Sequence, residues 1–321
     1  MPPTRRLLPS PVVAAVPDDL APAVAPARTT RSFGAVLKTY FMLTKPRVIE
    51  LLLVTTVPAM VLAAGKLPSV GLIAAVLVGG ALSAGGANTI NCWIERDRDQ
   101  VMRRTHSRPL PQGDISPRAA LVFGLVLEVV AFAWLWSTVN LLSAALSVSA
   151  MLFYVFVYTI WLKPRSPQNI VIGGAAGAVP VLVGWASVTG TLSLSAWVMF
   201  AIVFCWTPPH FWALSVRYRD DYAKAGIPML PVVVGIAAAS RQILVYAIVT
   251  VVVSFALVPV AGLGWIYGIS ALALGVMFVL GAAALVRKPT PETALKLFHF
   301  SNTYLALVFV AIAADVIVRA S

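Results

Sequence analysis

Residues 70–108 read VGLIAAVLVGGALSAGGANTINCWIERDRDQVMRRTHSR, an apolar run that ends in a cluster of charges. Residues 70–94 contain no charged side chain, and they are long enough for a helix that crosses a bilayer, which needs roughly 20 apolar residues. The next five residues, Glu95–Asp99, are all charged. The stretch therefore predicts a membrane-spanning helix with polar chemistry at one end.

Three oxygen-bearing side chains recur at every fourth position in this polar end: Asn91, Glu95 and Asp99. Successive residues of a helix turn by ~100°, so positions four apart share one face, and Arg103 continues the same spacing. Such a face of hard oxygen atoms can bind a divalent cation, which can in turn hold phosphate groups. The alternative is a solvated helix end where a span leaves the membrane.

The composition is that of a membrane protein. Of 321 residues, 60% are hydrophobic and 11% are charged, and the mean hydropathy is +0.89. A soluble domain has roughly 25% charged residues. The net charge of +12 invites a nucleic-acid interpretation, but the basic residues lie in loops between apolar runs, as membrane topology requires. We therefore expect no nucleic-acid partner.

Nine apolar segments are long enough to cross a bilayer, which predicts an all-α bundle of nine transmembrane helices. The predicted spans are 47–65, 70–94, 118–137, 141–162, 169–188, 194–216, 240–259, 263–286 and 297–317. They form one membrane domain over residues 39–321. Residues 1–38, rich in Pro, Ala and Arg, are expected to be a disordered cytoplasmic tail.

The distribution of basic residues predicts the orientation. With this set of spans, 22 of the 24 lysines and arginines fall on one side of the membrane. Because basic loops stay in the cytoplasm, we expect a cytoplasmic N-terminus and a C-terminus outside. This orientation places the charged end of the span 70–94 on the cytoplasmic face.

A second charged cluster, RYRDDYAK, occupies residues 217–224 directly after the predicted span 194–216. It lies on the same face of the membrane as the first. Asp220 and Lys224 are four residues apart, and Asp221 is adjacent. Carboxylates beside basic side chains suit a cation that carries a phosphate ester, because each charge then finds an opposite partner. The alternative is a basic loop with balancing acids.

Other polar residues leave two interpretations open. Lys163 and Arg165, between the two clusters on the same face, could contact phosphate or could serve only as topology determinants. His210 follows Pro208-Pro209 inside a span, and it could be a hydrogen-bonded group at a kink or a substrate contact. His210 and His299 have no second His or Cys at metal-ligand spacing, which argues against a zinc site.

These stretches together resemble the UbiA-type intramembrane prenyltransferases and, within them, the branch that farnesylates protohaem IX. The matching segments are LTKPRVIELLLVTT (43–56), NCWIERDRDQVMRRTHSRPLPQGDISPRAAL (91–121), WLKPRSPQNIVIGGAAGAVPVLVGW (161–185), WTPPHFWALSVRYRDDYAKAGIPMLPVVVG (206–235) and KLFHFSNTYLALVF (296–309). The family motif Asn-x-x-x-Asp-x-x-x-Asp is matched by Asn91, Glu95 and Asp99. Glu95 replaces the usual Asp and adds a methylene. The second motif is poorer in aspartates than in quinone-type relatives, which leaves the number of metal ions open.

The resemblance implies transfer of the farnesyl group of farnesyl diphosphate to a vinyl group of haem b, with addition of water, giving haem O and diphosphate. It implies Mg²⁺ held by the four carboxylates Glu95, Asp99, Asp220 and Asp221, with Asn91 as ligand or positioning group. It also implies neutralisation of the diphosphate by Arg103, Arg108, Lys163 and Lys224. Two further candidates for substrate contact are His210 and Tyr218.

The implied setting is the bacterial plasma membrane, with the lipid bilayer as surroundings and haem A synthase as a downstream partner. Two other functions stay open. One is prenyl transfer to another acceptor, such as a quinone precursor or chlorophyllide. The other is secondary transport, but transporters carry ions through acids near the bilayer midplane. Here the acids lie at one face beside many arginines, which argues against transport.

Overall fold

The computed structural model describes residues 32–320, and over residues 47–53 it describes only the backbone. All regular secondary structure in this part of the chain is helical. The helices are α1 (Phe33–Leu43), α2 (Pro46–Ala64), α3 (Val70–Val101), α4 (Pro117–Thr138), α5 (Leu141–Leu152), η1 (Phe153–Leu162), α6 (Asn169–Thr189), α7 (Leu194–Arg217), α8 (Arg219–Lys224), α9 (Leu230–Ala261), α10 (Trp265–Arg287) and α11 (Pro291–Ala320). Of the tail predicted over residues 1–38, residues 1–31 lie outside the described part, and residues 33–38 belong to α1.

Eight helical spans in the described residues are long and apolar enough to cross a membrane, and they correspond to the predicted spans from 70–94 onward. Helix α2 covers the remaining predicted span, 47–65, and its described side chains form a shorter apolar helix, Val54–Ala64. The chain is an all-α, multi-pass integral membrane protein. The count of nine spans and the orientation of the termini stay predictions.

Serine side chains set the starts of several spans. Ser69, Ser116 and Ser193 precede α3, α4 and α7, and each hydroxyl accepts a hydrogen bond from a backbone N–H of the first turn. Such a bond satisfies one of the amide groups that a helix start leaves free. The connections before α3 and α7 are short, so the spans that they join run antiparallel.

Two helices differ from the predicted spans. Helix α9 begins at Leu230, ten residues before the predicted span 240–259, and it is interrupted at Gly235 (φ 79°, ψ 165°). Only glycine adopts this conformation readily, so the first turn of α9 changes direction there. Helix α3 continues to Val101 and ends before Arg103. The spacing that placed Arg103 on the oxygen-bearing stripe was therefore wrong, because the helix does not extend that far.

The largest hydrophobic core lies among α6, α7, α9, α10 and α11. Its largest fully buried side chains include Trp212, Tyr267, Phe278, Tyr304 and Phe309. In a bilayer the lipid tails are as apolar as the helices, so close packing of this kind holds the helices together. Of these helices, α6 packs against α2 and η1, and α11 packs against α2.

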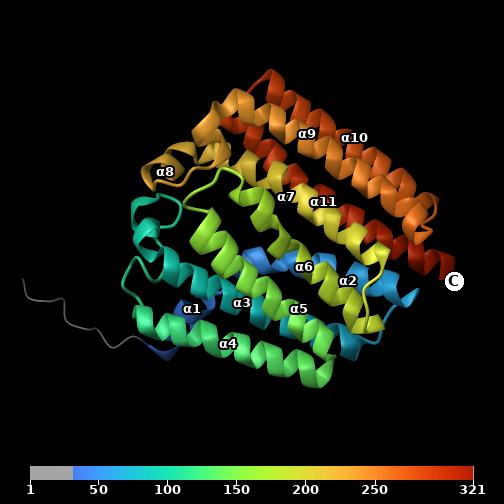
Figure 1. The fold of residues 1–321 in the computed structure, drawn as a ribbon, viewed down its shortest axis with the longest axis horizontal. Coiled ribbons are helices and arrows are strands. Elements are labelled where there is room, and N and C mark those ends of the chain that lie inside the picture. Colours follow the sequence, from blue (N-terminus) through green and yellow to red (C-terminus); the bar gives the residue numbers. More distant parts are fainter. Residues whose placement is uncertain (1–31, 321) are drawn as a thin grey trace, which may run out of the picture.

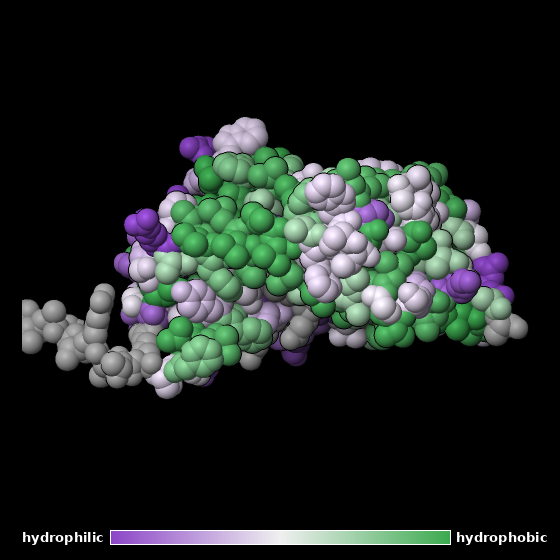
Figure 2. Space-filling view, turned by 90° about the horizontal axis from the view of Figure 1, so that it is seen from below, coloured by the Kyte–Doolittle hydropathy of each residue, from purple (hydrophilic) through white to green (hydrophobic). Residues whose placement is uncertain are grey.

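The charged segments gather at one end of the bundle. Figure 1 shows α8 and the loop after α3 together at the end opposite the C-terminus. On the face drawn in Figure 2, hydrophobic residues dominate the middle and hydrophilic residues gather toward the ends. This surface pattern fits a protein whose middle lies in lipid. The fold places the two charged clusters of the sequence at the same end of the bundle.

Candidate active site

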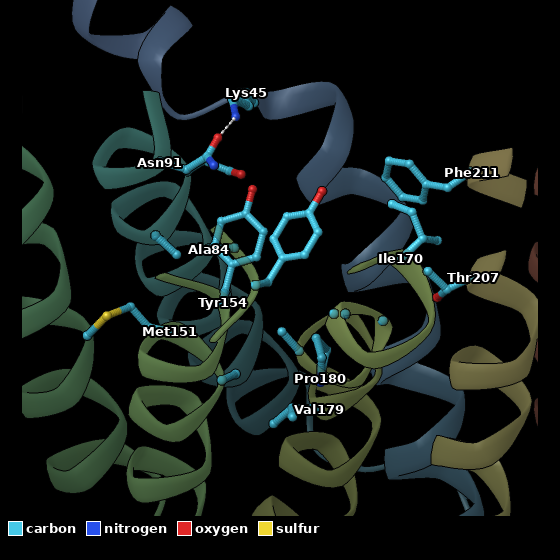
Figure 3. Close-up of a pocket in the computed structure, with 18 of the residues that line it drawn as sticks. Lys45, Ala84, Asn91, Met151, Tyr154, Ile170, Val179, Pro180, Thr207 and Phe211 are labelled. Atoms are coloured by element: carbon cyan, nitrogen blue, oxygen red, sulfur yellow. Dashed lines mark hydrogen bonds between the residues drawn. The ribbon is translucent and has the colours of Figure 1, made fainter. Parts of the chain in front are cut away.

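A cavity of about 280 Å³ opens between α2, α3, α5, η1, α6 and α7. One part of its lining is charged, with side chains from α3, the loop after α3 and the segments flanking α2 and η1. The rest is mainly apolar. Figure 3 shows Lys45 and Asn91 at one end of the cavity, and Met151, Val179 and Pro180 farther along it. The shape suits a ligand with an anionic head and a long apolar body.

The oxygen-bearing stripe predicted on α3 lines the charged end. Asn91, Glu95 and Asp99 are all buried, with 1–3% of their surface exposed. Asp97, two residues from each acid, points away: its side chain is 77% exposed and lies 3.7 Å from Arg96. Asn91, Glu95 and Asp99 therefore share one face of α3, as the four-residue spacing predicted, and that face lines the cavity.

Each member of the stripe is matched with one basic side chain from elsewhere in the chain. Lys45 Nζ donates a hydrogen bond to Asn91 Oδ1 at 2.6 Å, and Lys163 Nζ forms an ion pair with Glu95 Oε1. Arg108 Nη1 donates to Asp99 Oδ2 at 2.7 Å. Tertiary structure thus converts one helix face into three polar pairs.

The two lysines of these pairs differ electrostatically. Burial alone would lower the pKa of Lys163, but the adjacent Glu95 carboxylate outweighs burial and raises it. Lys45 has a neutral amide oxygen as its direct partner, and burial lowers its pKa. The charged form of Lys45 is therefore the less well compensated of the two.

The second charged cluster is held against the loop after α3. Asp221 is buried, and its Oδ2 accepts a hydrogen bond from the backbone N–H of Arg104 at 3.3 Å. The Arg104 guanidinium lies over the rings of Tyr218 and Tyr222 at 5.7 and 5.9 Å, and it donates to Tyr222 Oη at 3.3 Å. Arg104 and Tyr222 both line the cavity. Helix α8 therefore joins the first cluster through Arg104.

Several predicted site residues lie outside the cavity lining in this structure. Asp221 contacts Arg104 but does not line the cavity, and Tyr218 packs on the same arginine. Three further residues predicted to bind the metal or the diphosphate are exposed and do not line the cavity: Arg103, Asp220 and Lys224.

His210 has a structural environment. Its ring stacks on Trp206 at 4.2 Å and on Phe298 at 4.5 Å, and its Nδ1 lies 2.7 Å from Ser301 Oγ. It is buried between α7 and α11 and does not line the cavity, whereas its neighbour Phe211 does. These contacts correspond to the hydrogen-bonded alternative for this histidine.

Sequence reasoning missed several residues of the cavity, among them Lys45, Tyr154 and Tyr158. Both tyrosines belong to η1, a π-helix, and their rings stack with centroids 5.4 Å apart. Thr159 Oγ1 donates to Tyr154 O five residues back and accepts from Asn91 Nδ2 at 3.1 Å, which ties η1 to α3. A π-helix is rare and is frequently found at a functional site, and the sequence analysis did not predict one here. For Lys45, the sequence offered one indication: it is a basic residue directly before a proline, Pro46, where a helix can begin.

Gly173 of α6 keeps room for the Tyr158 ring. A Cβ at this position would lie 2.9 Å from Tyr158 Cγ and 3.0 Å from Cε2, closer than ordinary contact. We expect Gly173→Ala to lower the free energy of unfolding by about 1–3 kcal/mol, because overpacking forces the ring to move. Thermal unfolding in detergent measures this. The control Gly268→Ala, with no atom within 4 Å, should lose nothing. Equal losses in both variants would contradict the prediction.

Comparison with known proteins gives a consistent family. Residues 52–308 match the UbiA prenyltransferase family. The chain is 54% identical over 292 residues to protoheme IX farnesyltransferase 2 of Saccharopolyspora erythraea, which covers 90% of each chain. It is 52% identical to protoheme IX farnesyltransferase of Salinispora tropica, over 90% of this chain and 91% of that one.

A solved structure has the same fold at low identity. A UbiA homolog from Archaeoglobus fulgidus bound to GPP and Mg²⁺ has a TM-score of 0.60 at 16% identity, over 85% of this chain and 99% of that one. At this identity the structural match shows only that the fold is the same. The family follows from the sequence matches. The chain belongs to the UbiA prenyltransferase family.

Proposed function

We propose that the chain transfers the farnesyl group of farnesyl diphosphate to a vinyl group of protohaem IX, giving haem O. The observation that carries this proposal is the cavity, with paired carboxylates and cations at one end and an apolar body. The relatives named protoheme IX farnesyltransferase support the choice of both substrates. Relatives from bacteria support the plasma membrane as the location, and haem A synthase is proposed as the enzyme that takes up the product.

The residues at the charged end fit Mg²⁺. Glu95 and Asp99 present two buried carboxylates to the cavity, beside the amide oxygen of Asn91. Mg²⁺ commonly binds through one or two carboxylates and substrate phosphates rather than through a cage of protein ligands. In the described part of the chain, Asp220 and Asp221 do not join Glu95 and Asp99 in a cluster of three or more metal-ligating side chains. The A. fulgidus homolog bound to GPP and Mg²⁺ supports the same cofactor here. When bound, the ion would neutralise charge on the diphosphate.

The charged residues of α8 form the second part of the proposed site. Asp220 and Asp221 are proposed as further metal ligands, and Lys224 and Arg103 as diphosphate contacts. The bond from the Arg104 N–H to Asp221 holds α8 against the loop that also carries Arg108. That contact supports a single site shared by the two charged clusters.

The basic side chains of the cavity would stabilise the leaving group. The allylic C–O bond breaks, and its electron pair stays on the diphosphate. Lys163 and Arg108, which pair with Glu95 and Asp99 here, are placed to neutralise this charge. The remaining farnesyl cation lies among apolar walls that exclude water, near the faces of Tyr154 and Tyr158. An aromatic face stabilises a desolvated cation by up to ~2 kcal/mol.

The haem vinyl group then forms the new C–C bond to the farnesyl carbon. Water adds to the cation that this leaves on the haem side chain and loses a proton, which gives the hydroxyethylfarnesyl group. Water must therefore be absent while the farnesyl cation exists and must reach the haem carbon afterwards.

Membranes that contain the chain test the proposal when they are incubated with farnesyl diphosphate, Mg²⁺ and one acceptor at a time. We expect protohaem IX to be converted to a pigment whose mass is greater by one farnesyl group and one hydroxyl group. Conversion of a quinone precursor or chlorophyllide instead would establish the other acceptor. Ion-coupled uptake into vesicles that is lost in the double variant Glu95→Gln, Asp99→Asn, without any prenylated product, would establish transport.

A further inference from the structure

Lys45 has an unusual backbone conformation between α1 and α2. Its φ of 54° and ψ of 60° make it the only non-glycine residue with positive φ in the described part of the chain. The left-handed region is disfavoured for side chains with a Cβ. Residues held in such conformations cluster at functional sites, where the surrounding structure maintains them.

The surroundings of Lys45 show what maintains this conformation. Asn88 Nδ2 of α3 donates a hydrogen bond to the carbonyl oxygen of Thr44 at 3.0 Å. Thr44 also packs on Gly85, where an added Cβ would lie 3.2 Å from Thr44 Cβ. The turn before Lys45 is thus fixed to α3. On the other side Pro46 begins α2 and disfavours the right-handed helical conformation for the residue before it.

This backbone brings the Lys45 ammonium into the cavity, as Figure 3 shows. Nζ donates to Asn91 Oδ1 at 2.6 Å. The two other cations of the stripe, Lys163 and Arg108, each have a carboxylate as direct partner. The direct partner of Lys45 is neutral. A buried ammonium is stabilised most by an anionic partner, and among the side chains that the structure describes none forms a direct ion pair with Lys45.

We propose that Lys45 is a substrate-binding residue whose ammonium contacts an anionic oxygen of the diphosphate. This inference rests on the proposed function and adds a residue to it. In this structure Lys45 Nζ is hydrogen-bonded to Asn91 Oδ1. If the ammonium moved to the diphosphate, that oxygen would be free to bind the metal ion. Asn91 would then serve first as the partner of a lysine and later as a ligand.

Three substitutions at Lys45 separate its charge from its backbone. Lys45→Met removes the charge and keeps the length, and Lys45→Arg keeps the charge. Lys45→Gly removes the charge and also the steric penalty of positive φ. Lys38→Met is the matched control, because Lys38 is an exposed lysine of α1 that does not line this cavity.

The experiment measures binding of inorganic pyrophosphate with MgCl₂, and separately of protohaem IX, to detergent-solubilised full-length protein by the shift in unfolding temperature. We expect Lys45→Met and Lys45→Gly to weaken pyrophosphate binding by about 10–100-fold, the usual effect of losing a charge-assisted hydrogen bond. Lys45→Arg should retain most of the binding. Protohaem affinity should be unchanged in all variants, and without ligand Lys45→Gly should unfold no earlier than wild type.

Two results would overturn the inference. Wild-type pyrophosphate affinity in Lys45→Met would show that the ammonium does not contact the diphosphate. A loss confined to protohaem would assign Lys45 to the carboxylates of the acceptor. Both results leave the proposed function intact if the wild-type protein binds pyrophosphate and makes haem O. If the wild-type protein neither binds pyrophosphate nor makes haem O, the proposed function is wrong, and the inference about Lys45 is wrong with it.

Discussion

Asp99→Asn is expected to reduce the rate of prenyl transfer by about 10²–10³-fold, the usual effect of removing one preorganised electrostatic group from an active site. Asp99 is 3% exposed, lines the cavity and holds Arg108 Nη1 at 2.7 Å. An amide in its place removes a proposed metal ligand and leaves Arg108 without its carboxylate. The measurement is the initial rate of haem O formation in membranes, normalised to the amount of folded protein.

Asp97→Asn is the matched control for this loss. It makes the same chemical change two residues away on α3, at a side chain that is 77% exposed and 3.7 Å from Arg96. We expect its rate to be close to that of wild type, because exposed ion pairs contribute little. A wild-type rate in Asp99→Asn, or an equal loss in both variants, would mean that position on the α3 stripe does not determine function.

Lys163→Met is expected to have the largest effect on stability. Lys163 and Glu95 are both buried and form an ion pair, so removal of the lysine leaves the Glu95 carboxylate buried without its direct cationic partner. Breaking a buried pair in this way destabilises a protein by about 3–5 kcal/mol. Thermal unfolding in detergent should show the loss, and haem O formation should fall to background, because a proposed diphosphate contact is also removed.

The double variant Lys163→Met, Glu95→Gln separates these two effects. With both charges gone, most of the lost stability should return, because the desolvation penalty of the remaining carboxylate disappears. Activity should not return, since the diphosphate contact and a metal ligand are both absent. A double variant that regains both stability and activity would show that this pair is structural only.

The charged cluster on α8 shows where sequence reasoning about the site reaches its limit. The spacing within residues 217–224 indicated a patch that suits a phosphate ester, and Asp221 is indeed buried against Arg104. Asp220 and Lys224, on the other face of this short helix, are exposed in the structure. Periodicity identifies which residues share a face, but it does not say toward what that face turns. For α8 that depends on packing against the loop after α3.

Local pattern alone predicted the eight long apolar spans and the α3 stripe. Apolar runs about as long as a bilayer is thick can satisfy their backbone hydrogen bonds only as helices, so hydropathy predicts the spans without knowledge of their neighbours. A spacing of four residues likewise placed Asn91, Glu95 and Asp99 on one face, because helical geometry is local. The resemblance of several segments to one family then indicated the chemistry.

Only the tertiary structure decided which cations meet that stripe. Lys45, Arg108 and Lys163 are 46, 9 and 68 residues from their partners Asn91, Asp99 and Glu95 along the chain. Many other lysines and arginines occupy the same predicted face. The family resemblance indicated Arg108 and Lys163 for the site but not Lys45, and no spacing along the chain showed which carboxylate or amide each cation contacts. Their selection follows from the left-handed turn at Lys45, the π-helix before Lys163 and the loop before Arg108. Each of these depends on packing between segments that are distant in sequence, which is why the sequence alone could not reveal it.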